Sequence, residues 1–148
     1  SQRWVVHARS ASFPQHKGMI DYNQPYYNEQ YAFVFNGLLR GVRLPQRVAG
    51  TIGAQKIWGL LQHYLVTQPP VEALQQLRHT LVMHTQELKA LNIGLADASG
   101  CYAFCTFARH PAYYTLQLHR SADLQMICSE PLAGYAFETV MPNQLVTI

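Results

Sequence analysis

The sequence is poor in charge and in long apolar runs, and each deficit excludes a class of protein. Only 13% of the 148 residues are charged, whereas about a quarter is usual for a free-standing domain. The eleven lysines and arginines form no run that could follow a phosphate backbone, so we expect no nucleic-acid partner. No uninterrupted apolar run reaches about 18 residues, so we expect no membrane span and no membrane partner.

Cysteine is also scarce, and none occurs in the first hundred residues. Cys101, Cys105 and Cys128 lie inside apolar stretches. An odd number of cysteines in such surroundings is typical of reduced, buried thiols rather than of a disulfide framework. We therefore expect a cytoplasmic protein. The seven histidines show no metal-ligand spacing, so neither a metal nor another cofactor is expected.

Hydrophobic residues, by contrast, are plentiful, at 49% of the chain. This content and the length predict one domain over residues 1–148 with a proper core. The low charge and the apolar Trp4–Val6 close to the start indicate that another chain, or a segment absent from this sequence, covers part of the surface. We therefore expect a fragment or a subunit, and a homo- or hetero-oligomer stays open.

The order of expected elements predicts an α+β fold. Helices are expected at residues 51–66 and from the Pro69–Pro70 pair to about residue 91, from apolar residues at three- and four-residue intervals. Strands are expected at 3–9, 31–36, 93–96, 101–107, 113–119, 124–128 and 145–148, with hairpin loops at 97–100 and 119–123. Helices grouped between runs of strands fit layered sheets and helices better than alternating βαβ units.

The first two expected strands each end in polar groups. Arg9 and Ser12 follow the first strand, and Asn36 and Gly37 follow the second. A guanidinium fork suits a carboxylate, and an Asn amide beside a glycine N–H suits the oxygen of a tetrahedral intermediate. If the two ends meet, they form half of an amide-cleaving site, which lacks its nucleophile.

Several segments together resemble the class II glutamine amidotransferase domain. They are Val-His-Ala-Arg9, Asn23-Gln-Pro25, Phe-Val-Phe-Asn36-Gly37, and Gly50-Thr51 before a helix containing Leu60-Leu61. Two later segments, Ile127–Leu132 and Met141–Ile148, resemble the branch of that family that includes the ergothioneine-pathway γ-glutamyl hydrolase. The similarity covers nearly the whole chain, in the same order.

This resemblance implies an N-terminal-nucleophile hydrolase fold, a four-layer αββα sandwich of antiparallel sheets, incomplete here at its N-terminal side. In that family an N-terminal cysteine attacks the side-chain amide of glutamine, with its own α-amine as the base. A γ-glutamyl thioester forms and ammonia leaves. The family's carboxylate-binding arginine corresponds to Arg9, its oxyanion-binding asparagine and glycine to Asn36 and Gly37, and a hydroxyl residue of the pocket to Ser12.

Three departures from the family pattern bear on activity. No cysteine lies near position 1, so the nucleophile is absent from the chain. Ile52 stands where the family has the aspartate that binds the α-ammonium of glutamine, and Phe35 stands where it has histidine. The implied substrate is a small molecule with a carboxylate and a γ-amide, without a free α-amine, unless the site no longer turns over.

Three functional hypotheses stay open. The first is a glutaminase or γ-glutamyl amide hydrolase domain whose cysteine comes from an upstream segment or a partner chain. The second is a non-catalytic relative that binds a small carboxylate or serves in assembly. The third is a hydrolase that uses Ser1 as its N-terminal nucleophile. The site residues also have ordinary interpretations: Asn36-Gly37 as a type I′ hairpin turn, Arg9 in a surface salt bridge and Ser12 as a cap.

Overall fold

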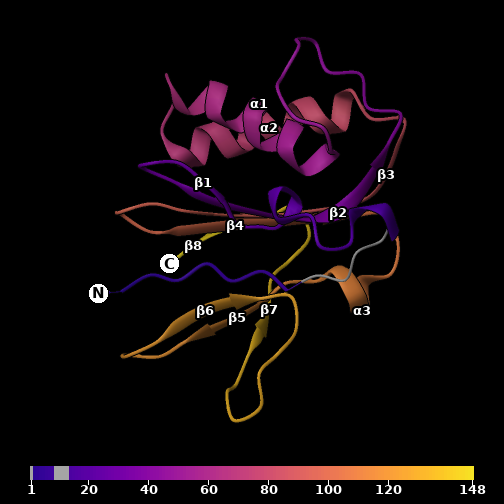
Figure 1. Cartoon of the computed structure of the whole chain (residues 1–148). Coiled ribbons are helices and arrows are strands. Elements are labelled where there is room, and N and C mark those ends of the chain that lie inside the picture. The colour runs from indigo at the N-terminus through magenta and orange to yellow at the C-terminus, as the bar shows by residue number, and fades with distance from the viewer. Residues whose placement is uncertain (1, 9–13) are drawn as a thin grey trace.

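A computed structural model describes residues 2–8 and 14–148, which form two antiparallel sheets and a helical layer (Figure 1). The larger sheet has the order β1-β2-β3-β4-β8 and the smaller sheet the order β6-β5-β7. The strands are β1 Tyr26–Tyr27, β2 Ala32–Arg40, β3 Glu87–Ala96, β4 Cys101–Phe107, β5 Gln117–Arg120, β6 Gln125–Cys128, β7 Glu138–Thr139 and β8 Leu145–Thr147. The helices are α1 Gly53–Leu65, α2 Pro70–Met83 and the single turn α3 Pro111–Tyr114, besides two short 3₁₀ turns at Pro14–His16 and Ile20–Tyr22.

The layers follow the order helices, large sheet, small sheet. Helices α1 and α2 lie together over one face of the large sheet, and the small sheet lies under its other face (Figure 1). This arrangement confirms the predicted α+β class with stacked antiparallel sheets. Within the described residues it supplies the first three layers of the αββα sandwich.

The main core lies between the helices and the large sheet. Proline at the first position of α2 starts that helix, since its missing N–H costs nothing there. Apolar residues at helical spacing on α1 and α2 then meet the large apolar residues of β2, β3 and β4. The fully buried members of this core include Phe33, Leu60, Leu61, Leu74, Leu77, Leu81, Leu91 and Phe104.

A second, smaller core lies between the two sheets. Along β4, Tyr102 and Phe104 join the helix-facing core, whereas Ala103 and Cys105 join the core between the sheets. This alternation is what a strand with period-two side chains requires when both of its faces are covered. Leu116, Leu118, Val140 and Val146 complete the second core from the smaller sheet and from β8.

The predicted strand at residues 3–9 is wrong over its described part. Residues 2–8 form no strand and run as an extended segment between the two sheets (Figure 1). Trp4 and Val6 are 79% and 83% exposed. The segment is held instead by the guanidinium of Arg3, which donates to the carbonyls of Ala98 (2.8 Å) and Ser99 (3.0 Å) in the β3–β4 turn. Apolar composition predicted a strand, but a strand also needs a hydrogen-bonded neighbour.

Two further boundaries differ from the sequence prediction. Helix α2 ends at Met83 rather than near residue 91, because Leu91 belongs to β3, which pairs with β2 and β4 on its two sides. The expected strand at 113–119 is divided into α3 and β5, since His110 adopts a left-handed conformation (φ 58°) and Pro111 starts a helical turn. The hairpins at 97–100 and 119–123 are confirmed.

Candidate functional site

Asn36 and Gly37 lie in the middle of β2, not at its end. Asn36 pairs with Asn92 of β3, and Gly37 pairs with Leu91. Both the predicted end of the strand at residue 36 and the hairpin-turn alternative are therefore wrong. The pattern Asn-Gly is typical of turns, but here two strand neighbours determine the conformation instead.

The side chain of Asn36 projects from the face of the large sheet that the helices do not cover. Asn92 lies directly opposite Asn36, and Cys105 of β4 lies directly opposite Asn92. Residues paired in this way project to the same face, and Cys105 belongs to the core between the sheets. Asn36 is nevertheless exposed. The face toward the small sheet is thus buried at β4 but exposed at Asn36 of β2.

Within residues 2–8 and 14–148, no strand pairs with β2 beside Asn36 on the side away from β3. The side-chain amide of Gln24 donates to the Phe35 carbonyl (3.0 Å) and accepts from the Phe35 N–H (2.6 Å), as a neighbouring strand would. The backbone groups of Phe35 therefore point away from β3. Since these directions alternate along an antiparallel strand, the N–H and C=O of Gly37 point to the same edge, and β1 pairs only with Ala32 and Phe33.

Position 37 has no room for a side chain. A Cβ there would collide with the carbonyl oxygen of Ala90 and would lie 2.9 Å from both the Ala90 carbonyl carbon and Phe35 Cε2. Glycine thus allows β2 and β3 to approach closely where the register shifts between Leu38 and Leu39. An exposed amide and an edge-facing backbone N–H consequently lie next to each other on one rigid strand.

The start of α1 carries no carboxylate that could bind an ammonium group. Ile52 is the N-cap residue, and its side chain has no oxygen. The side chain of Gln55 caps this end instead, because its Oε1 accepts from the N–H groups of Thr51 (2.8 Å) and Ile52 (3.3 Å). Its Nε2 donates to the carbonyl of Asp21 (3.0 Å), which ties the helix to the preceding loop.

None of the three cysteines is poised as a nucleophile. Burial raises the pKa of the Cys101, Cys105 and Cys128 thiols above its ordinary value, so the reactive thiolate is disfavoured. Cys105 is the cysteine on the face of Asn36, two strands away or about 10 Å. Its thiol is buried and directed at the carbonyls of Val140 (3.8 Å) and Met141 (3.9 Å).

The other predicted site residues lie outside the described part of the chain. These are Arg9 and Ser12, expected to line the pocket, and Ser1, the alternative nucleophile. Their meeting with Asn36 and Gly37 stays a prediction. Among residues 2–8 and 14–148, no group of His, Cys, Asp or Glu side chains could hold a metal ion. Over the same residues, no helix combines the length and apolar character that crossing a bilayer requires.

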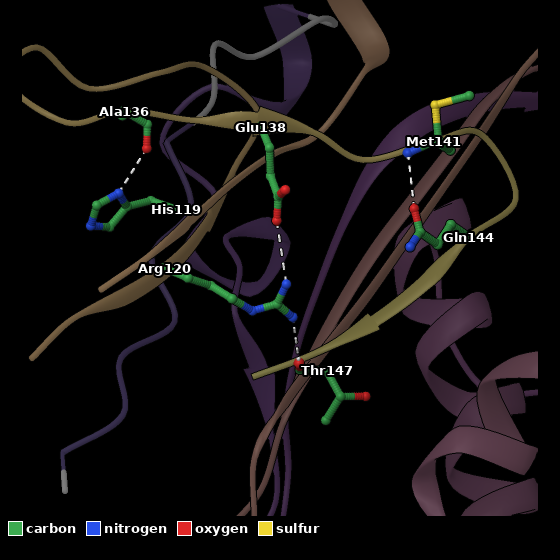
Figure 2. Close-up of polar contacts among 7 residues, drawn as sticks. All are labelled: His119, Arg120, Ala136, Glu138, Met141, Gln144 and Thr147. Atoms are coloured by element: carbon green, nitrogen blue, oxygen red, sulfur yellow. Dashed lines mark hydrogen bonds and ion pairs between the residues drawn. The ribbon is translucent and has the colours of Figure 1, made fainter. Parts of the chain in front are cut away.

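A separate hollow of about 210 Å³ lies between the small sheet and β8. Figure 2 shows Arg120 of β5 reaching across it: the guanidinium pairs with Glu138 (3.3 Å) and donates to the Thr147 carbonyl (3.2 Å). Nearby, His119 Nδ1 lies 2.7 Å from the Ala136 carbonyl and the Met141 N–H donates to Gln144 (3.2 Å). Of these contacts, the one between Arg120 and the Thr147 carbonyl joins the two sheets, at the edge of the large sheet away from β2.

The sequence interpretation gave no role to three residues that make specific contacts in the structure: Gln24, Asn92 and Arg120. A signal existed for Asn92, because it is the one polar residue of the apolar run Leu91–Leu95, and a polar residue inside a buried strand calls for a specific partner. Gln24 was noted only within the segment Asn23-Gln-Pro25. The contacts of Gln24 and Arg120 could not be assigned from the sequence, since they include backbone groups distant in sequence.

Comparison with protein-family models and with curated proteins finds no match. Among solved structures, the chain is similar to a glutamine aminotransferase class-II domain protein from Silicibacter pomeroyi, with a TM-score of 0.67 and 18% sequence identity. The similarity covers 84% of this chain, which spans 66% of the other chain. The chain therefore has the α+β fold, with stacked antiparallel sheets, of a class II glutamine amidotransferase domain.

Proposed function

We propose that this chain is the substrate-binding and oxyanion-binding part of a glutamine amidotransferase-like amide hydrolase. The observation that carries this proposal is the pair formed by the exposed amide of Asn36 and the edge-facing N–H of Gly37. Two donors on one rigid strand can stabilise the oxyanion that forms when a nucleophile attacks an amide carbonyl. The fold supports the same assignment, since it is the fold of domains of this kind.

In this proposal Arg9 binds the carboxylate of the substrate through its guanidinium fork, and Ser12 lines the same pocket. The nucleophile is a cysteine outside these residues, on an upstream segment or a partner chain. This part of the proposal is supported by the raised pKa of all three thiols in the chain. No cofactor takes part, and the three free thiols fit a reducing, cytoplasmic setting.

The substrate class in this proposal is a γ-glutamyl amide, as in the branch that includes the ergothioneine-pathway γ-glutamyl hydrolase. Ile52 at the N-cap of α1 offers no oxygen to an α-ammonium group. A blocked or substituted α-amine is therefore preferred over the free α-amine of glutamine.

A second candidate function is that of a non-catalytic relative that binds a small carboxylate or serves in an assembly. Ile52 also favours this second candidate, because a site without a carboxylate that binds the α-ammonium group can also be inactive. A direct assay separates the two candidates. The chain alone and the product of its complete reading frame are incubated with L-glutamine and with Nα-acetyl-L-glutamine, and released ammonia is measured.

We expect the complete product to hydrolyse both amides, and the acetylated one faster. We expect no hydrolysis by the chain alone. In the complete product, Arg9→Ala should weaken substrate binding by roughly 2–5 kcal/mol because a buried carboxylate loses its partner. Arg9→Lys is the matched control, since it keeps the charge and loses the fork. Activity of the chain alone would favour Ser1 as the nucleophile, and an inactive complete product would favour the binding or assembly function.

A further inference from the structure

Asn92 has a buried hydrogen-bonding group with no partner. The residue is 4% exposed, in the middle of β3. Its Nδ2 donates to the carbonyl of Tyr114 (2.6 Å), whereas its Oδ1 is buried and accepts no hydrogen bond from the residues that the structure describes. A buried acceptor without a donor costs free energy, on the order of 1–3 kcal/mol. An amide in such a place therefore calls for a use of that oxygen.

The orientation of this amide is fixed by its surroundings. The Tyr114 carbonyl can only accept a hydrogen bond, so it holds the NH₂ end of Asn92 and turns Oδ1 away from itself. Of the two residues directly opposite Asn92 on its face, Cys105 is not the donor, because its thiol is directed at carbonyls of residues 140 and 141. The other residue is Asn36.

Asn36 is within reach of this oxygen. The Cβ atoms of directly opposite residues in an antiparallel pair lie about 4.5–5.5 Å apart, so a rotation of the Asn36 side chain brings its NH₂ group to Asn92 Oδ1. The Asn36 amide is exposed and projects from the same face. It carries two N–H groups, one more than a single oxyanion needs.

We propose that Asn92 is a positioning residue for the oxyanion site. Its Oδ1 accepts one N–H of the Asn36 amide, and the other N–H of Asn36 is thereby aimed at the substrate oxygen. Three groups then form a chain from the Tyr114 carbonyl through Asn92 to Asn36, and the donor is held in place before the reaction begins. This inference rests on the proposed oxyanion role of Asn36.

The contact itself can be measured in this chain without any activity. In a protein with ¹⁵N-labelled asparagine, hydrogen exchange is followed by NMR for the two side-chain amide protons of Asn36. One proton should exchange at least about tenfold more slowly than in a free amide. In Asn92→Leu, which has a similar volume and no acceptor, both should exchange at the free rate.

Thr80→Val is the matched control. Thr80 is also buried (5% exposed) and hydrogen-bonds to Tyr64 (3.0 Å), but it lies on α2, on the helix side of the large sheet. Its replacement removes a buried polar group without touching Asn92, so it should leave the Asn36 amide signals unchanged. Equal loss of protection in this variant would assign the effect to general loosening and overturn the proposal.

Turnover in the complete protein gives the second readout. Asn92→Leu should lower kcat for Nα-acetyl-L-glutamine about three- to tenfold, which corresponds to the loss of one hydrogen bond, and should leave KM unchanged. An Asn36 amide that exchanges freely in the unsubstituted protein overturns the proposal even where Asn92→Leu does not fold. If Asn36→Ala leaves kcat unchanged, the proposed oxyanion function fails. If Asn36→Ala lowers kcat but Asn92→Leu does not, only the positioning role of Asn92 is rejected.

Discussion

The two faces of the large sheet differ sharply in composition, and the difference separates the face that stabilises the fold from the face that carries the proposed site. The face toward the helices carries large apolar residues, among them Phe33, Leu91 and Phe104, which are at most 1% exposed. The opposite face carries an exposed asparagine on β2, a buried asparagine on β3 and a small thiol on β4. Because the helix side supplies most of the buried apolar area, the other side can leave polar groups accessible at one edge.

The space between the two sheets also differs from one end to the other. At β4 and β8 it is closed by small apolar residues and by Arg120, which fastens the small sheet to the Thr147 carbonyl. At β2 it is open, and the amide of Asn36 is exposed there. The proposed site at Asn36 therefore lies beside a part of the molecule in which the two sheets are joined.

The largest effect on stability is expected from the helix-facing side. Phe104→Ala should lower the free energy of unfolding by about 3–5 kcal/mol, because it leaves a cavity in the main core. Asn36→Ala should change it by much less, about 1 kcal/mol, since that side chain is exposed and contributes at most its proposed hydrogen bond to Asn92. Urea denaturation of both variants measures the contrast, and similar losses in the two would abolish the distinction between the faces.

A smaller loss of stability is expected at Gly37, where β2 and β3 approach closely. Gly37→Ala should cost about 1–3 kcal/mol, because the added Cβ meets the Ala90 carbonyl and the strands must move apart. Gly53→Ala is a suitable control, since a Cβ at that position meets nothing within 4 Å. Thermal unfolding compares the pair. A stable Gly37→Ala protein would show that β2 and β3 are not held closely at the site.

The Arg120 bridge between the sheets should contribute less. Arg120→Met removes both the ion pair with Glu138 and the bond to the Thr147 carbonyl, and should cost about 1 kcal/mol, because the side chain is 48% exposed. Arg40→Met removes an ion pair with Glu87 within the large sheet and should cost less than about 0.5 kcal/mol. Equal effects in chemical denaturation would mean that Arg120 does not fasten the sheets.

The smallest effect concerns the β3–β4 turn. Burial acts to raise the pKa of Asp97, but hydrogen bonds from Ser99 and Gly100 outweigh it and lower the pKa below its ordinary value of 3.8. The stability that Asp97 contributes is therefore complete above about pH 4 and is lost as the pH falls through the lowered pKa. Ser99→Ala should raise that pKa, measured by NMR titration of the carboxyl carbon. An unchanged pKa would contradict this account of the turn.

Prediction from the sequence succeeded for elements whose residue pattern fits only one kind of secondary structure. Strand Cys101–Phe107 was predicted with its observed bounds, because its residues are β-branched, aromatic or small and glycine precedes them. The α+β class followed from the order of elements. Two proline residues correctly marked the start of α2.

Other predictions failed where contacts distant in sequence decide the structure. Leucines at 88 and 91 continue the helical spacing of α2, but pairing with β2 places both in a strand. Trp4 and Val6 look like a strand but have no strand neighbour. For Asn36 and Gly37 the sequence indicated the residue types but not their position in the middle of a strand. The contacts along this strand edge could not be predicted either, because Gln24 bonds to Phe35, which lies eleven residues away.

The most direct test of the central claim is the turnover of Asn36→Ala in the complete protein with a γ-glutamyl amide as substrate. Loss of one oxyanion donor should lower kcat by about two to three orders of magnitude, while the unfolding free energy falls by only about 1 kcal/mol, the contribution of one hydrogen bond. Unchanged kcat in a folded Asn36→Ala protein would contradict the account and leave Asn36 as an ordinary strand residue.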